Sequence, residues 1–166
     1  MTPVAIGIDI GGTNTKYGVV DEKGNVLASS SLPTRKYELI EDYVAGISTA
    51  LQKMMAEISQ DVELRGIGIG APNANYFSGN IEMAPNLRWK GVIPLTDLFG
   101  KHFDVPITIT NDANAAAIGE MMYGAAKGEK DFIMITLGTG VGSGFVVNGN
   151  LVYGHDGFAG EFGHVT

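Results

Sequence analysis

Ile8-Asp9-Ile10-Gly11-Gly12-Thr13 runs into Gly18-Val19-Val20, and the same pattern returns where Ile135-Thr136-Leu137-Gly138-Thr139-Gly140 runs into Phe145-Val146-Val147. Each copy is a short apolar run, a turn of Gly and Thr, and a second apolar run, which predicts a β-hairpin. Glycine tolerates positive φ and has no Cβ, so successive N–H groups at such a turn can converge on an anion, and threonine hydroxyls add donors. Two such turns predict two domains that close on one nucleotide.

Other phosphate-binding motifs are excluded by inspection. No G-x-x-x-x-G-K-[ST] occurs, so the chain is not a P-loop protein. The dinucleotide pattern G-x-G-x-x-G that would start at Gly138 fails at Ser143, and a strand follows where that motif needs a helix. A single Gly-rich turn is equally typical of a tight hairpin. The repetition, with Asp9 just ahead of the first turn, favours phosphate binding.

The composition bounds the class of protein. The 166 residues, 45% of them hydrophobic, suffice for one core or one and a half domains. No apolar run approaches the ~20 residues of a membrane span, and no secretory signal is recognisable, so we expect a cytoplasmic protein without a membrane partner. The absence of Cys excludes disulfides and a thiolate zinc site within this chain. A net charge of −7 disfavours a nucleic-acid partner.

The hydrophobic pattern predicts an alternation of strands and helices. We expect three antiparallel strands, then helix, strand, helix, strand, helix and a final hairpin. The expected strands are 4–10, 15–20, 26–31, 64–69, 107–110 and 131–137, and the expected helices are 37–59, 94–103 and 113–126. This order is typical of an α/β fold of the ribonuclease-H or actin type.

Asp112 stands between an expected strand and an expected helix. In isolation it is typical of an ordinary helix N-cap. The small residues that follow it, Ala113 to Ala117, would let another molecule approach closely. A carboxylate at a helix N-terminus is favoured in its ionised form and can accept a proton, as the base of a phosphoryl transfer must.

Four motifs in order resemble the ROK family of repressors, open reading frames and sugar kinases, and the resemblance covers the whole chain. They are Asp9 to Thr13, Asn111 to Asn114, Leu137 to Gly144 and Gly160-Glu161-Phe162-Gly163-His164. Membership implies an actin-like ATPase (ribonuclease-H-like) α/β fold, with a hexose bound between two lobes. Residues 1–111 would form the N-terminal lobe and 112–166 the start of a second, similar but larger lobe, truncated at Thr166.

The resemblance also implies a role for individual residues. Asp9 would hold Mg²⁺ through water, and the phosphates of ATP would meet Gly11, Gly12, Thr13, Gly138, Thr139 and Gly140. Asp112 would be the general base, and the hexose would contact Asn86, Asn111, Asp112, Glu161 and His164. Outside the resemblance, Asn86 is also typical of a turn after Pro85, and Trp89 of a plain core residue.

His164 would have a second role in a longer protein. The family's histidine at this position ligates a structural Zn²⁺ together with three cysteines shortly downstream, which would lie beyond Thr166, as would the adenosine-binding residues. A lone His cannot hold a tetrahedral zinc, so this chain alone is expected to be zinc-free. His102 and His155 are expected to be ordinary loop residues, and Glu38, Glu41 and Asp42 a solvated helix face.

The implied activity is transfer of the ATP γ-phosphoryl group to a hexose, with glucose at its 6-hydroxyl the first choice. Kinases for fructose, allose or N-acetylmannosamine remain alternatives. A sugar-responsive repressor would need a helix-turn-helix ahead of Val4, and this chain would lack it. A non-catalytic actin-like assembly module is a third alternative. The full-length protein is expected to be a homodimer or homotetramer, and the isolated 166 residues are not expected to be active.

Overall fold

In a computed structural model, which describes residues 1–58, 61–138, 140–160 and 162–164, the N-terminal apolar runs form an antiparallel meander. Its strands are β1 (Thr2–Ile10), β2 (Asn14–Asp21) and β3 (Val26–Pro33). β4 (Val62–Gly70) then pairs in parallel with β1, and β7 (Ile107–Thr110) pairs in parallel with β4. The resulting order, β3-β2-β1-β4-β7, confirms the expected α/β arrangement.

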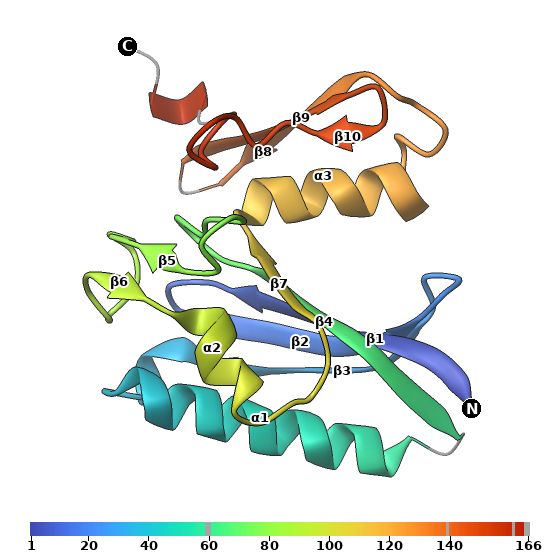
Figure 1. Ribbon diagram of the computed structural model, residues 1–166, viewed down its shortest axis with the longest axis vertical. Helices are drawn as coiled ribbons and strands as arrows, with labels where there is room; N and C mark the ends of the chain where they lie inside the picture. The colour runs from blue at the N-terminus through green and yellow to red at the C-terminus, as the bar shows by residue number, and fades with distance from the viewer. Residues whose placement is uncertain (59–60, 139, 161, 165–166) are drawn as a thin grey trace.

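One face of this sheet carries the hydrophobic core. Alternate residues of β1 point to it, and Val4, Ile6, Ile8 and Ile10 are all buried, as a half-buried strand requires. They belong to one apolar cluster with the inner faces of α1 (Ile40–Glu57) and α2 (Leu95–Gly100). Figure 1 shows both helices on the same side of the sheet.

Both helices are shorter than the sequence predicts. The chain before α1 forms a 3₁₀ turn, η1 (Thr34–Lys36), and Leu39 is still extended, so the helix starts at residue 40 and not 37. Pro94 lies just outside α2 with a non-helical ψ of 71°. Two short strands, β5 (Ile81–Glu82) and β6 (Val92–Ile93), form a ribbon that hydrophobic periodicity does not reveal, because two-residue strands carry no period.

A second sheet lies on the other side of α3 (Asp112–Tyr123), as Figure 1 shows. It consists of β8 (Phe132–Leu137), β9 (Val141–Val147) and β10 (Asn150–Leu151), in the order β10-β9-β8. A last 3₁₀ turn, η2 (Phe162–His164), follows. Small residues allow α3 to approach both sheets: a Cβ added at Gly144 would lie 2.9 Å from Ala117, and one added at Gly70 would lie 3.2 Å from Ala115.

The alanines of α3 therefore serve internal packing. The sequence suggested that they leave room for another molecule, but Ala113 and Ala117 are buried between the helix and β9. The helix also ends at residue 123 and not 126. The Glu120 carboxylate accepts a hydrogen bond from the Ala125 N–H at 2.7 Å, which satisfies the backbone just after the helix and turns the chain away.

The outer face of the second sheet is apolar and open. Ile133, Ile135 and Leu137 alternate along β8 and are 56%, 58% and 82% exposed. An open apolar face of this kind favours self-association of the chain. No described helix is long and apolar enough to cross a membrane.

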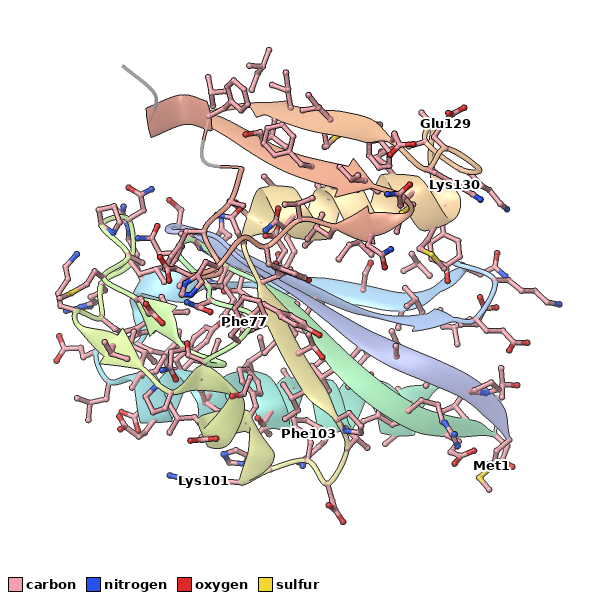
Figure 2. The ribbon with its side chains drawn as sticks, turned by 45° about the horizontal axis from the view of Figure 1, so that its top comes forward. Met1, Phe77, Lys101, Phe103, Glu129 and Lys130 are labelled. Carbon is pink, nitrogen blue, oxygen red and sulfur yellow. The ribbon has the colours of Figure 1, made fainter. Side chains whose placement is uncertain are left out.

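Two loops, one after β4 and one after β10, contact each other and link the five-stranded sheet to the three-stranded sheet. Asn75 donates a hydrogen bond from Nδ2 to the carbonyl oxygen of Asp156 at 2.9 Å, and Tyr76 stacks on Tyr153 with ring centroids 4.2 Å apart. Figure 2 shows Phe77 beside β7, whereas Glu129 and Lys130 lie near the end of α3 away from that strand. The polar loop 71–80 is thus fixed against the segment that follows β10.

Candidate functional site

The carboxyl ends of the three parallel strands β1, β4 and β7 bring Asp9 and Asp112 together. Asp9 near the end of β1 is in register with Gly70 at the end of β4. A Cβ added at Gly70 would lie 3.7 Å from the Cα of Asp112, which begins α3 directly after β7. Crevices at the carboxyl edge of such sheets are where α/β proteins bind ligands. Asp9 and Asp112, 103 positions apart, therefore share one edge of the sheet.

The electrostatics of Asp9 reflect this neighbourhood. Desolvation by the surrounding protein raises the pKa of Asp9, and the nearby negative charge of Asp112 raises it further, while the positive charge of Lys16 lowers it. Lys16 faces Asp9 across β1 and β2, where the two residues are paired in the antiparallel register. Two carboxylates that repel each other are a site where a cation is favoured.

Asn111 is the residue that caps α3. Its side-chain oxygen accepts a hydrogen bond from the Ala113 N–H at 2.8 Å, and Asp112, the expected cap, is the first helical residue. The Asp112 carboxylate shares that same N–H, also at 2.8 Å. Its side chain is exposed, so the carboxylate lies at the helix N-terminus within reach of solvent or a ligand.

The first glycine turn is shaped by close contacts. The Gly11 N–H donates to the Asn14 carbonyl at 3.1 Å, so this amide is used within the turn. Neither Gly11 nor Gly12 has positive φ, which corrects the reason given above for glycine here. Glycine is required because an added Cβ would lie 2.8 Å from the Asn14 oxygen at Gly11, and 2.7 Å from the Asn86 oxygen at Gly12.

That second contact places Asn86 at the site. Its backbone packs directly on Gly12, and its side chain is exposed beside the turn. The predicted sugar residue and the predicted phosphate loop are therefore neighbours. Trp89, three residues later, is 7% exposed and lies against Tyr43 with ring centroids 4.7 Å apart, which confirms its place in the core.

The second glycine turn is more open. No atom lies within 4 Å of a Cβ added at Gly138 or Gly140, and Gly138 does not have positive φ. The Gly138 N–H donates to the Gly140 carbonyl at 3.0 Å. Figure 1 shows that the β1–β2 and β8–β9 turns lie on the same side of the molecule. Thr139, Glu161 and the side chain of His164 lie outside the described residues.

Sequence reasoning missed two basic residues at this site. Lys16 was not singled out, although a four-residue turn between Ile10 and Thr15 places it opposite Asp9. Arg35 was also missed: its Nε donates to the carbonyl oxygen of Gly12 at 3.0 Å. No motif surrounds Arg35, and only the tertiary structure brings it to a residue 23 positions earlier.

Comparison with known proteins finds two kinds of relative, glucokinases and xylose repressors. The glucokinase of Halalkalibacterium halodurans is 39% identical over 163 residues, which cover 97% of this chain and 49% of that protein. The xylose repressor of Caldicellulosiruptor bescii is 33% identical over 163 residues, covering 97% of this chain and 41% of that protein.

A solved structure is equally similar. The ROK family glucokinase from Streptomyces griseus, in complex with glucose and AMPPNP, has 39% identity and a TM-score of 0.79, and the match covers 98% of this chain and 50% of that one. The chain thus spans about half the length of the curated glucokinases that it matches. The ROK family model matches residues 5–166, and the chain belongs to the ROK family.

Proposed function

We propose that the protein containing this chain is an ATP-dependent hexose kinase that phosphorylates glucose at its 6-hydroxyl. The observation that carries the proposal is the pair of carboxylates, Asp9 and Asp112, at the sheet edge beside the Gly12 turn. The relatives support glucose as the substrate, because glucokinases match at 35–40% identity and xylose repressors at 31–33%.

Asp112 is the base in this proposal. Its exposed carboxylate at the start of α3 can orient the attacking hydroxyl and accept its proton. Phosphoryl transfer through a loose transition state needs orientation more than a strong base, so an ionised aspartate suffices. Asn111 precedes it in the chain, and Asn86 lies against the Gly12 turn; amide side chains can both donate to and accept from sugar hydroxyls. Glu161 and His164 complete the proposed hexose site.

Asp9 is the proposed magnesium residue. Mg²⁺ is usually bound by one or two carboxylates, several waters and the phosphates of its nucleotide, and it neutralises charge on the transferred group. Asp9 fits this pattern, because burial and the neighbouring charge of Asp112 both raise the pKa of its carboxyl, and a bound cation would offset both effects. The phosphates would meet the turn 11–13 from one lobe and Gly138, Thr139 and Gly140 from the other.

The proposed two lobes meet at residues 111 and 112. The five-stranded sheet belongs to residues 1–111, and α3 packs on the three-stranded sheet that follows it. A structural Zn²⁺ would need further ligands besides His164, because a single His cannot hold a tetrahedral zinc, and within the described part of the chain no three His, Cys, Asp or Glu side chains cluster around a common point. A homodimer or homotetramer remains our expectation for the full-length protein.

The test is the variant Asp112→Asn in the full-length protein. Loss of the base should lower kcat by about 10²–10⁴-fold while the Kd for glucose stays within a few-fold, because the lost interaction is made mainly during transfer. Coupled-enzyme kinetics and calorimetry measure the two quantities. Asp104→Asn is a matched control, since Asp104 lies on the loop between α2 and β7 and is not near the site. Unchanged turnover in Asp112→Asn would refute the assignment.

A further inference from the structure

The backbone carbonyls of the first glycine turn are held on one side by the segment that follows β3. The Gly12 oxygen accepts a hydrogen bond from Arg35 Nε at 3.0 Å, and the Thr13 oxygen accepts one from the Thr34 N–H at 2.9 Å. Two consecutive carbonyl groups of the turn therefore accept hydrogen bonds from two consecutive residues, Thr34 and Arg35.

The hydrogen bond from Arg35 fixes the direction of the Thr13 amide. A trans peptide is planar, so its C=O and N–H point in opposite directions. The peptide that joins Gly12 to Thr13 has its oxygen on Arg35, and its nitrogen is that of Thr13. The Thr13 N–H must therefore point away from Arg35. Among the described residues, no acceptor takes the N–H of Gly12 or of Thr13.

The orientation matters for an anion. Carbonyl oxygens carry partial negative charge and repel phosphate, whereas N–H groups attract it, so a turn binds phosphate only if its amides and not its carbonyls face the ligand. A turn with two glycines has little steric preference of its own. The contact of Arg35 with the Gly12 carbonyl favours one of the two orientations of this peptide.

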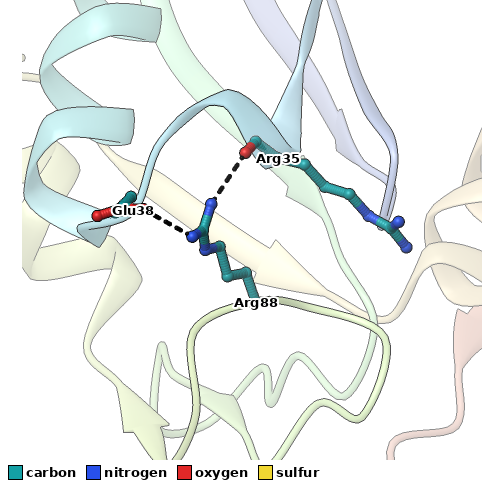
Figure 3. A network of polar contacts seen from close by, with 3 residues as sticks. All are labelled: Arg35, Glu38 and Arg88. Atoms are coloured by element: carbon teal, nitrogen blue, oxygen red, sulfur yellow. Dashed lines mark hydrogen bonds and ion pairs between the residues drawn. The ribbon is translucent and has the colours of Figure 1, made fainter.

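Arg35 is itself held in place. Figure 3 shows the Arg88 guanidinium between the Arg35 carbonyl and the Glu38 carboxylate, at 3.2 Å and 2.9 Å, while the Arg35 side chain extends the other way. Arg88 lies two residues after Asn86. Its two hydrogen bonds therefore join the predicted sugar loop to the segment that holds the carbonyls of the glycine turn. Among the described residues no carboxylate pairs with Arg35.

We propose that Arg35 is a positioning residue of the kinase: by holding the Gly12 carbonyl, it turns the Thr13 amide toward the phosphates of the nucleotide. The proposal rests on the proposed function for its ligand, but the orientation of the turn is a property of the chain alone. Arg35 acts through the peptide and need not touch the transferred group.

The first experiment uses the full-length protein without nucleotide. Arg35→Met removes the donor and keeps the aliphatic stem, and Lys36→Met removes the adjacent charge without touching the turn. The ¹⁵N and ¹H chemical shifts of the Thr13 amide should change in Arg35→Met and stay unchanged in Lys36→Met. The hydrogen-exchange rate of that amide should also change in Arg35→Met only. An unmoved Thr13 amide in Arg35→Met would overturn the proposal, because a purely ligand-contacting arginine leaves the free turn unaltered.

The second experiment uses the full-length protein. Arg35→Met should raise the KM for ATP and the Kd for AMPPNP about tenfold, the loss expected for one charge-assisted hydrogen bond, with the KM for glucose within twofold. Arg35→Lys should recover part of the loss, and Lys36→Met should match the parent. Unchanged AMPPNP affinity in Arg35→Met, or a fall in kcat with the same KM, would overturn the positioning role. If the parent shows no kinase activity, the proposed function fails while the amide shifts still decide the orientation of the turn.

Discussion

Gly12→Ala tests the contact on which the candidate site is built. A Cβ at this position would lie 2.7 Å from the carbonyl oxygen of Asn86, whereas ordinary van der Waals contact begins at 3.4 Å. The turn and the loop around Asn86 must therefore separate by about 0.7 Å. Since the neighbour is backbone, it cannot rotate away as a flexible side chain would.

The expected cost is about 1–3 kcal/mol of unfolding free energy, the usual range for an overpacked contact. Displacement of Asn86 should also raise the KM for glucose in the full-length protein about tenfold, since small misplacements of a binding group are costly. Urea unfolding followed by circular dichroism measures the first effect, and steady-state kinetics measures the second, both in the full-length protein.

Two other glycines provide matched controls. Gly7 and Gly68 are paired in β1 and β4, and no atom lies within 4 Å of a Cβ added at either. Gly7→Ala and Gly68→Ala should unfold within about 0.5 kcal/mol of the parent, because a surface substitution without a steric clash has little effect. If Gly12→Ala unfolds at the same urea concentration as these controls, the contact between the turn and the Asn86 loop does not exist and the reasoning fails.

Three further predictions concern single side chains. Folding raises the pKa of Asp9, so the protonated carboxyl stabilises the fold fully below the usual pKa of 3.8, and this stabilisation is lost as the pH rises through the raised pKa. Asp9→Asn should therefore resist urea better than the parent at pH 7, and the difference should close toward pH 3. Gly138→Val should leave urea unfolding unchanged, because its Cβ meets nothing, yet weaken AMPPNP binding at least about tenfold in calorimetry; equal affinity would remove the turn from the phosphate site. Tyr43→Phe should cost about 1–2 kcal/mol in urea unfolding, because the buried Tyr43 hydroxyl bonds Thr15 Oγ1 at 2.9 Å, and a smaller loss than about 0.5 kcal/mol would contradict this.

The fold and the order of its elements could be read from the sequence because the signals are local. Alternation of apolar residues in β1 and helical spacing in α1 each arise within one element, and both elements appear within three residues of their expected bounds. The ends were less predictable. Whether Leu39 is helical, or whether α3 continues past Tyr123, depends on contacts such as that between the Ala125 N–H and Glu120.

The sequence by itself determined which residues carry chemistry: the repeated Gly and Thr turns, and Asp9 and Asp112 beside them. Only the tertiary structure decided how they act together. Burial and the nearby charge of Asp112 raise the pKa of Asp9, the need for glycine at position 12 depends on the Asn86 backbone, and the direction of the Thr13 amide depends on Arg35. The first two pairs span more than 70 positions. The third spans 23 and joins the β1–β2 turn to the 3₁₀ turn that follows β3. Charge repulsion, steric contact and hydrogen bonding act through space, so no periodicity or motif along the chain could reveal them.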